Sequence, residues 1–225
     1  MTRLRLTLAA LLALSANPLL AQAALPPPPA APVGTTAAPR PATVFVRIVT
    51  GEGPILLELE KEKAPVTVAN FLKYVDLKRY DGISFYRAVA VPNEPSQGFV
   101  QGGIREDARK ILPPISHEPT TRTGLHHTDG AISMARNAPG TATCDFFIIV
   151  GDMTYMDANP AAPGDNQGYA VFGHVVEGMD VVKKILAAPR SPTAGAGVMK
   201  GQMLAVPVRI LTARRATAPA SPKAP

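Results

Sequence analysis

The sequence contains no tryptophan and only one cysteine, Cys144. A single cysteine cannot form an intramolecular disulfide, so the fold must be stabilised by packing alone. Because Cys144 stands close to Phe146 and Phe147, we interpret it as a small buried residue and not as a catalytic or redox-active thiol. The 225 residues, 46% of them apolar, are enough to bury the core of one domain.

The motifs of common hydrolytic and metal enzymes are also absent. The sequence has no Gly-x-Ser-x-Gly segment, which marks a nucleophile elbow, and no His-Glu-x-x-His segment, which marks a zinc site. His126 and His127 are adjacent, but neighbours on a strand point to opposite faces, so they cannot share one metal ion. We therefore expect no metal and no cofactor.

The net charge of +6 does not indicate a nucleic-acid partner once it is placed along the chain. All of it comes from basic residues near the two ends, which are Arg3, Arg5, Arg40, Arg214, Arg215 and Lys223. Between residues 41 and 213, basic and acidic residues are equal in number. The central region therefore has no excess positive charge with which to attract a phosphate backbone.

The N-terminal residues 1–23 have the pattern of a secretory signal peptide. Two arginines precede an apolar run at residues 6–14, and Ala21-Gln22-Ala23 is a small-residue cleavage pattern. The apolar run is too short to cross a hydrocarbon core of roughly 30 Å, which disfavours a membrane anchor. We predict that the protein is exported to the periplasm, that cleavage follows Ala23, and that no transmembrane segment remains.

Proline and alanine dominate the two regions that flank the central part of the chain. Residues 24–41 hold seven prolines and favour an extended spacer, and residues 214–225 repeat this composition as a predicted disordered tail. This leaves residues 42–213 as the single folded domain, which we expect to be monomeric.

Short apolar-rich runs separated by turn residues predict a mostly β domain. Residues 43–50 and 55–59 flank a glycine-rich turn and predict an opening hairpin. Residues 65–75 carry an apolar stripe at helical spacing, and a second helix is predicted at 179–187. Further strands are predicted at 83–89, 99–102, 131–135, 145–150, 170–176 and 206–212. Many short strands with two separate helices favour a β-barrel capped by helices.

Three segments alternate polar and bulky apolar residues, namely Phe85-Tyr86-Arg87, Phe99-Val100-Gln101-Gly102-Gly103 and Asp145-Phe146-Phe147. On a strand, Phe99 and Gln101 share one face, as do Asp145 and Phe147. Such a face has an apolar floor edged by hydrogen-bonding groups, and an arginine beside it indicates recognition of a peptide.

In the order and approximate spacing of these segments, the sequence resembles the cyclophilins, which are peptidyl-prolyl cis/trans isomerases, and above all their bacterial periplasmic branch. The resemblance covers about Thr43 to Thr212 and also rests on Ile132-Ser133-Met134-Ala135 and Tyr169-Ala170-Val171-Phe172-Gly173-His174-Val175. It implies a closed eight-stranded antiparallel β-barrel, capped by two α-helices, with an active groove on the outer face of the sheet.

The resemblance also implies the residues of the groove, with Arg87 and Gln101 as the catalytic pair. The implied substrate-binding residues are Phe85, Phe99, Met134, Ala135, Arg136, Asn137, Asp145, Phe147, Tyr155, Met156 and Tyr169. Among these, Phe99, Met134 and Phe147 would form the pocket for the proline ring. Residues 135–137 would hold the substrate chain through their backbone.

Such an enzyme needs no nucleophile, because the barrier of roughly 18–20 kcal/mol comes from the partial double bond of the X–Pro amide. Twisting the amide localises a lone pair on the proline nitrogen, to which Arg87 would donate a hydrogen bond in the transition state. The expected clients are proline-containing polypeptides. The expected role is the folding of exported proteins, in which this isomerisation is a slow step.

Several positions depart from the family pattern. Tyr86 replaces a histidine, Tyr155 a tryptophan and Tyr169 another histidine, and residues 88–98 predict a longer loop. Asp145 replaces a glutamine that donates a hydrogen bond, whereas an ionised carboxylate only accepts. We expect Asp145 to form an ion pair with Arg87 across the groove and so to weaken catalysis.

Two other functions stay open. A catalytically weak peptide-binding module or holdase would use the same groove, and the substitution at Asp145 is the argument for it. A barrel that encloses a small apolar ligand is the other alternative, and the bulky Val, Ile and Phe residues of the predicted strands argue against it.

Overall fold

The computed structural model of the chain describes residues 42–105 and 107–219. The predicted signal peptide at 1–23 and the predicted spacer at 24–41 lie outside these described residues. The elements in chain order are β1 (Val44–Thr50), β2 (Gly53–Leu59), α1 (Pro65–Asp76), β3 (Ser84–Val91), β4 (Glu94–Gly103), η1 (Ala108–Lys110), α2 (Thr120–Thr123), β5 (Ala131–Met134), β6 (Phe146–Val150), η2 (Thr154–Met156), β7 (Ala170–Glu177), α3 (Met179–Ala187), η3 (Gly197–Met199) and β8 (Met203–Ala216).

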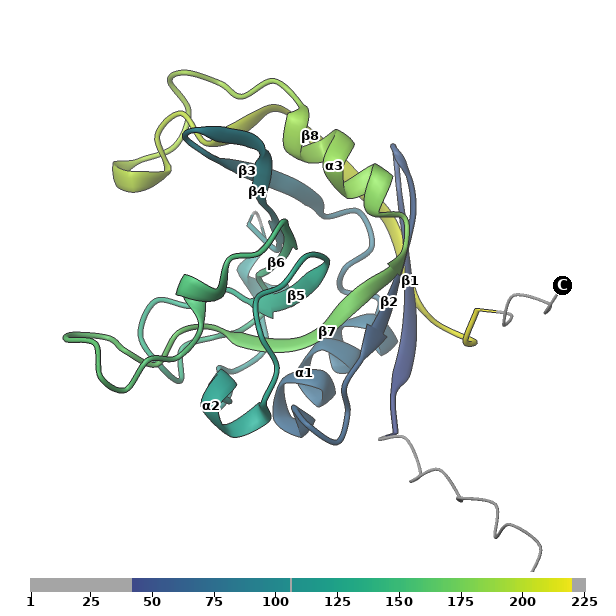
Figure 1. The fold of residues 1–225 in the computed structure, drawn as a ribbon. Helices are drawn as coiled ribbons and strands as arrows, with labels where there is room; N and C mark the ends of the chain where they lie inside the picture. Colours follow the sequence, from purple (N-terminus) through teal and green to yellow (C-terminus); the bar gives the residue numbers. More distant parts are fainter. Residues whose placement is uncertain (1–41, 106, 220–225) are drawn as a thin grey trace, which may run out of the picture. The chain divides into compact units, whose positions relative to one another are not determined.

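The strands close into one antiparallel barrel in the order β1-β2-β7-β5-β6-β4-β3-β8 (Figure 1). The opening hairpin is confirmed, because β1 pairs with β2 from Val44 with Leu59 to Thr50 with Gly53. The last strand, β8, pairs with both β1 and β3 and so completes the barrel. Closure leaves no strand edge unpaired along the ring, and it confirms the predicted fold class.

The two longer helices cover the two ends of the barrel, with α1 at the lower end and α3 at the upper end in Figure 1. The apolar stripe predicted for α1 is confirmed, since Val68, Phe71, Leu72 and Val75 are all buried. The second helix, α3, begins and ends at the predicted residues and buries Val182 and Ile185 among other side chains.

Side chains fill the interior of the barrel. The ring of Phe71, from α1, lies with its centroid 5.1 Å from Tyr80, 5.5 Å from Phe146 and 5.2 Å from Phe172. Cys144 is buried and free, as predicted. Each large apolar side chain buried in this way stabilises the fold by about 1.5–3 kcal/mol. A packed interior disfavours the alternative in which the barrel encloses a small ligand.

The prediction of a long loop at residues 88–98 is wrong. β3 continues to Val91 and β4 begins at Glu94, so the two strands form a long hairpin with a register shift between Ala90 and Val91. Gly98, at φ 150°, permits this close pairing, because a Cβ there would collide with the carbonyl oxygen of Val89. The prolines and polar residues of the segment are typical of loops, which is why its pattern misled the prediction.

The predicted boundary of the C-terminal tail is also wrong, because β8 extends to Ala216. Arg214 donates to the carboxylate of Asp81 at 2.7 and 2.6 Å, and Arg215 donates to that of Asp76 at 2.8 Å. The strand also pairs with β1 through this stretch. These partners lie more than a hundred residues away in the sequence, so composition alone did not reveal them.

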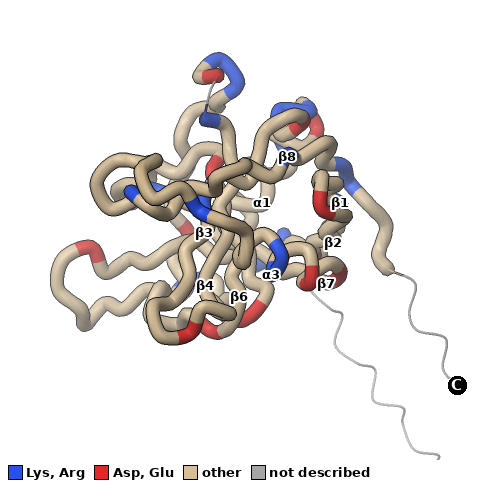
Figure 2. The backbone as a smooth tube through the Cα atoms, turned by 90° about the horizontal axis from the view of Figure 1, so that it is seen from above, with Lys and Arg blue, Asp and Glu red and all other residues tan. Residues whose placement is uncertain are grey.

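Charged residues of both signs are spread around the barrel (Figure 2). This distribution gives no reason to expect a polyanion as a partner. In the described part of the chain, no helix combines the length and apolar character that a membrane crossing requires.

Candidate functional site

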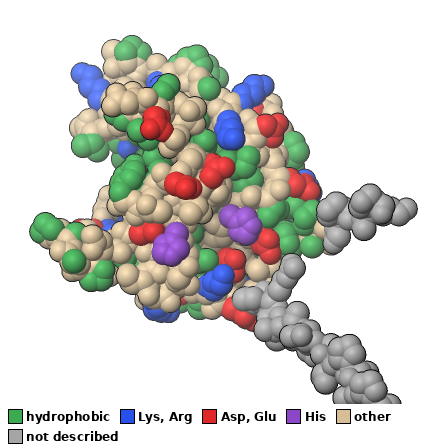
Figure 3. Space-filling model, in the orientation of Figure 1, with side chains coloured by type: hydrophobic (Ala, Val, Ile, Leu, Met, Phe, Trp, Pro, Cys, Tyr) green, Lys and Arg blue, Asp and Glu red, His purple; other side chains and the backbone are tan. Residues whose placement is uncertain are grey.

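A groove of about 220 Å³ lies on the outer face of the sheet, over β3, β4 and β6. Figure 3 shows the molecule hollowed at the left, between an upper projection that contains η3 and a lower one formed by the loop after η2. The lining residues are Tyr86, Arg87, Phe99, Gln101, Ala135, Arg136, Asn137, Thr141, Thr143, Asp145, Phe147, Met156, Tyr169 and Met199.

The floor of the groove is apolar because β4 and β6 turn alternate side chains outward. Phe99 and Gln101 of β4 lie beside Ile149 and Phe147 of β6 in the pairing register. The rings of Phe99 and Phe147 are 5.3 Å apart, and Phe147 meets the edge of Tyr169 at 5.4 Å. These rings form an apolar surface that is separate from the barrel interior.

Arg87, on β3, is held at one side of this floor. Its Nη1 donates to Oε1 of Gln101 at 2.9 Å, while Nε and Nη2 both donate to Oε1 of Gln202 at 2.9 and 2.5 Å. The guanidinium lies 5.3 Å from the centre of the Phe99 ring. Burial lowers the pKa of Arg87, yet a guanidinium remains protonated at neutral pH. The site therefore presents a fixed cation beside an apolar surface.

A row of hydrogen bonds continues from Gln101 to Asp145. Nε2 of Gln101 donates to the hydroxyl of Tyr86 at 2.7 Å, and that hydroxyl donates to Oδ2 of Asp145 at 2.6 Å. The predicted ion pair between Arg87 and Asp145 is wrong, because no ion pair within the described residues joins them. The carboxylate of Asp145 accepts a hydrogen bond from the hydroxyl of Tyr86 instead.

The structure brings most of the predicted site residues together and separates three of them from the groove. Phe85 and Met134 point into the barrel, where Phe85 packs against Phe146 at 5.7 Å. They belong to the core because their neighbours Tyr86 and Ser133 take the outward positions on the same strands. Tyr155 is 76% exposed and does not line the groove, whereas Met156 of the same turn does.

Five contributors were not among the predicted site residues, and one of them is Tyr86 of β3. Thr141 and Thr143 come from the segment before β6, and Met199 and Gln202 come from the segment between α3 and β8. These segments are rich in Gly, Ala and Thr and have no periodicity, so nothing in the local pattern marks them. Only the path of the chain brings them to the groove.

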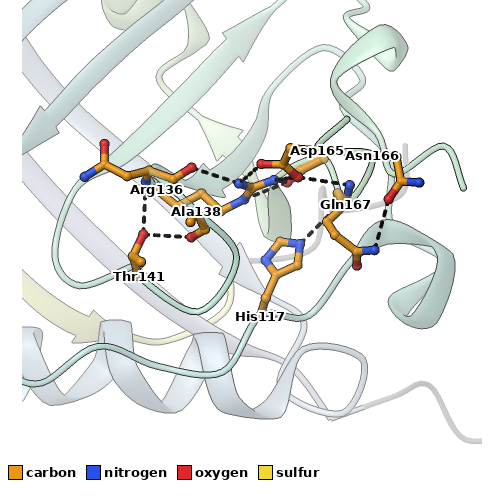
Figure 4. Close-up of polar contacts among 9 residues, drawn as sticks. His117, Arg136, Ala138, Thr141, Asp165, Asn166 and Gln167 are labelled. Atoms are coloured by element: carbon orange, nitrogen blue, oxygen red, sulfur yellow. Dashed lines mark hydrogen bonds and ion pairs between the residues drawn. The ribbon is translucent and has the colours of Figure 1, made fainter. Parts of the chain in front are cut away.

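The side chain of Arg136 organises one wall. It forms a two-point ion pair with Asp165 at 2.5 and 2.9 Å and donates from Nε to the carbonyl of Gly168 at 2.9 Å (Figure 4). Nearby, Thr141 accepts from the backbone N–H of Asn137 and donates to the carbonyl of Ala138. Arg136 thus ties the loop before β7 to the groove, and its side chain is almost fully buried.

Beneath the floor, three side chains form a row that resembles a hydrolytic triad. Nδ1 of His127 lies 2.6 Å from Oδ1 of Asp157, and Nε2 lies 3.1 Å from the hydroxyl of Ser133. Both His127 and Ser133 are completely buried, so no substrate bond can reach the hydroxyl. The row is a structural network that supports Phe147, whose ring stacks on His127 at 6.0 Å.

The polar groups of the groove are suited to binding a polypeptide and not to holding a metal. In the described ranges, no group of three or more His, Cys, Asp or Glu side chains is arranged to hold a metal ion. A packed barrel with an external groove, an apolar floor and a fixed arginine defines a class of protein that binds an extended chain on its surface.

Comparison with known proteins gives the family. The family model of the cyclophilin type peptidyl-prolyl cis-trans isomerases matches residues 45–214, and the chain belongs to this family. A peptidyl-prolyl cis-trans isomerase of Acinetobacter baylyi is 39% identical over 67% of this chain and 76% of its own length. Peptidyl-prolyl cis-trans isomerase A of Dickeya dadantii is 40% identical over 64% of this chain and 71% of its own length.

Solved structures agree on the fold. A crystal structure of a cyclophilin type isomerase from Cryptosporidium parvum covers 79% of this chain and 100% of its own, with a TM-score of 0.60 and 19% identity. The same protein in the presence of the dipeptide Ala-Pro covers 77% and 99%, with a TM-score of 0.59 and 19% identity. The family model and the relatives confirm the predicted resemblance to the cyclophilins and the enzyme class, and the solved structures confirm the predicted barrel.

Proposed function

We propose that the protein isomerises X–Pro peptide bonds in the groove of β3, β4 and β6, and that Arg87 is its catalytic residue. The observation that carries this proposal is the guanidinium held at the edge of the Phe99 and Phe147 surface. Three of its five N–H groups are engaged by Gln101 and Gln202, which leaves two for a substrate.

The chemistry follows from the twisted amide. The proline ring packs on Phe99 and Phe147, and the carbonyl before it rotates through the barrier of roughly 18–20 kcal/mol. At the twisted geometry the proline nitrogen accepts a hydrogen bond, which it does not accept when the amide is planar. Arg87 therefore binds the transition state more tightly than either isomer, and each about 1.36 kcal/mol of this preference gives tenfold in rate.

The rest of the groove positions the substrate chain. Residues 135–137 line the groove together with Arg87, while Met156 and Tyr169 extend the apolar surface. The substrate class is proline-containing polypeptide, bound without a cofactor. The apolar floor also excludes water, which would otherwise compete for the N–H groups of Arg87.

We further propose that the clients are exported proteins and that the chain itself is exported by the segment at residues 1–23. Folding steps limited by proline take tens to hundreds of seconds without catalysis, so an isomerase is useful where unfolded chains arrive. Cell fractionation with mass analysis of the mature N-terminus tests this, and an uncleaved cytoplasmic protein would contradict it.

A second candidate function is a holdase that binds proline-containing segments without accelerating their rotation. The carboxylate of Asp145 in the groove favours it, because a carboxylate cannot donate to a substrate carbonyl. Exchange measured by NMR on a short X–Pro peptide separates the two functions, since both bind the peptide and only the isomerase accelerates exchange.

The decisive variant is Arg87→Ala. We expect kcat/KM to fall by roughly 10- to 150-fold, because the charge-assisted hydrogen bond from Arg87 to the proline nitrogen, about 1.5–3 kcal/mol in the transition state, is lost. Arg47→Ala is the matched control, because Arg47 forms an exposed ion pair with Glu177 away from the groove. Activity of Arg87→Ala within threefold of wild type, about 0.65 kcal/mol, would refute the assignment.

A further inference from the structure

The row of hydrogen bonds from Asp145 to Gln101 has no part in the chemistry just described. It links a carboxylate to the catalytic arginine through Tyr86 and Gln101, with donor–acceptor distances of 2.6, 2.7 and 2.9 Å. Tyr86 and Gln101 are each only 5% exposed. Water therefore competes little for these groups, and each bond is retained.

The chemistry of the two ends fixes the direction of every bond in the row. A carboxylate only accepts, so the single hydroxyl proton of Tyr86 points to Asp145 and its oxygen faces Gln101 as an acceptor. A guanidinium only donates, so Gln101 must turn Oε1 toward Arg87 and Nε2 toward Tyr86. Both ends thus demand the same orientation of the Gln101 amide, and a flipped amide would bring two donors against each other at Arg87.

Three features hold Asp145 in this row. Gly103 leaves the space in which the carboxylate lies, because a Cβ at that position would collide with Oδ1 of Asp145. The backbone carbonyl of Asp145 accepts from the N–H of Ala135 at 2.8 Å. The thiol of Cys144 donates to Oδ1 at 3.4 Å, which leaves Oδ2 for Tyr86.

The acid–base behaviour of the neighbours agrees with these directions. Burial, with the charge of Asp145, raises the pKa of Tyr86, so the phenol keeps the proton that it donates. The same two causes raise the pKa of Cys144 to about 11, so the thiol is a donor as well.

We propose that Tyr86 and Asp145 are positioning residues, which fix the amide of Gln101 and thereby aim the free N–H groups of Arg87 at the proline nitrogen. The proposal rests on the proposed function of Arg87. It gives Asp145 a different role from the ion pair expected from the sequence. The residue contributes to catalysis through Tyr86, although it donates nothing to the substrate.

Three variants test the row. Tyr86→Phe removes the hydroxyl and keeps the ring, and Asp145→Ala removes the acceptor that orients it. We expect kcat to fall by about tenfold in each with KM nearly unchanged, the equivalent of one hydrogen bond of about 1.4 kcal/mol. Asp145→Asn keeps an oxygen that accepts from Tyr86, so it should restore activity to within about threefold of wild type.

The double variant Tyr86→Phe/Asp145→Ala separates a row from two independent effects. Because both changes break the same chain, we expect the double variant to lose no more activity than either single variant. Additive losses, or a Tyr86→Phe enzyme within twofold of wild type at an unchanged melting temperature, would overturn the proposal. Failure of Asp145→Asn to rescue would also overturn it.

A measurement without substrate distinguishes the row from the proposed function. The side-chain amide of Gln101 and the Nη1–H of Arg87, which donates to Gln101, give separate nitrogen-15 resonances, and both should shift and exchange faster with water in Tyr86→Phe. If they do so while the wild-type protein accelerates no X–Pro exchange, the row exists and the proposed function fails. Unchanged resonances would refute the row whatever the activity.

Discussion

At the scale of single residues, the buried histidine under the groove has a consequence for stability. Burial lowers the pKa of His127 from its ordinary value of 6.5, although Asp157 opposes the shift. For Asp157, burial raises the pKa, and hydrogen bonds from His127 and His126 outweigh it and lower the pKa overall. The folded protein therefore holds a neutral imidazole between an aspartate and a serine.

This arrangement predicts that the folded protein becomes less stable as the pH falls. The unfolded chain takes up a proton at His127 as the pH falls through about 6.5, before the folded protein does, so protonation favours unfolding. The stabilisation from neutral His127 is complete above that pH and is lost as the pH falls toward the lower pKa of the folded state. Between pH 7 and pH 5 we expect the melting temperature to fall, by roughly 2–4 °C for each kcal/mol of unfolding free energy that is lost.

Two variants identify the group responsible. His127→Gln removes the titration and should flatten the dependence of melting temperature on pH across this range. His174→Gln is the control, because the side chain of His174 on β7 is 45% exposed. An equally steep dependence in His127→Gln and in wild type would assign the acid lability to other groups.

At the level of single residues, the sequence identified groups that stand in recognisable motifs. It did not identify groups whose role depends on a hydrogen-bond partner far away in the sequence. Arg87 and Phe147 were identified because they stand in motifs whose order along the chain resembles that of the cyclophilins. Tyr86 and Asp145 are 59 positions apart, and their hydrogen bond needs the register of three strands. Phe85 was assigned to the groove because a motif does not say which of two neighbours points outward.

At the scale of elements, the segment between α3 and β8 supplies part of the groove. It leaves the barrel at the bridge between Arg190 and Leu204 and is closed by the bond from Ser191 N–H to the Met203 carbonyl at 2.8 Å. This brings Met199 to the rim and Gln202 against Arg87. The segment therefore acts as a second support for the guanidinium, opposite Gln101.

We expect Gln202→Ala to reduce kcat/KM by about tenfold, because Arg87 loses an acceptor that takes two of its N–H groups. The measurement is X–Pro exchange under the conditions used for Arg87→Ala. Lys200→Ala, in the same exposed segment, should behave as wild type. Equal activity of the two variants would show that Gln101 alone is enough to hold Arg87.

The elements themselves were largely predictable. α3 begins and ends at the predicted residues because its apolar spacing is regular, and β1 and β2 follow from alternation around a turn. β8 was predicted short, since Arg214 and Arg215 have no apolar pattern and find their partners only on α1 and the loop after it. Segments that depend on long-range pairing have weak local signals.

At the scale of the whole molecule, the seam between β1 and β8 closes the barrel without any disulfide. Residues 213–216 pair with β1, and Arg214 and Arg215 hold the same stretch through ion pairs. A chain that ends at residue 213 should therefore melt at least about 2–4 °C lower than the full protein, since more than about 1 kcal/mol is lost.

A chain that ends at residue 216 is the matched control, and it should melt with the full protein. The measurement is thermal unfolding by circular dichroism, with the X–Pro assay to show whether the groove is affected. Identical melting of the two shortened chains would mean that the last strand residues contribute nothing to closure.

The two faces of the barrel wall are also under different constraints, because one packs the interior and the other faces the groove. Along β4 and β6, residues such as Val100 and Ile148 determine whether the protein folds, while Phe99 and Phe147 meet the outer surface. Substitutions on the outer positions leave the interior packing intact, so client preference can diverge with little penalty in folding. The pattern predicts that relatives with different clients vary at groove positions other than Phe99 and Phe147, which hold the proline ring that every client shares, and that such changes leave the barrel interior untouched.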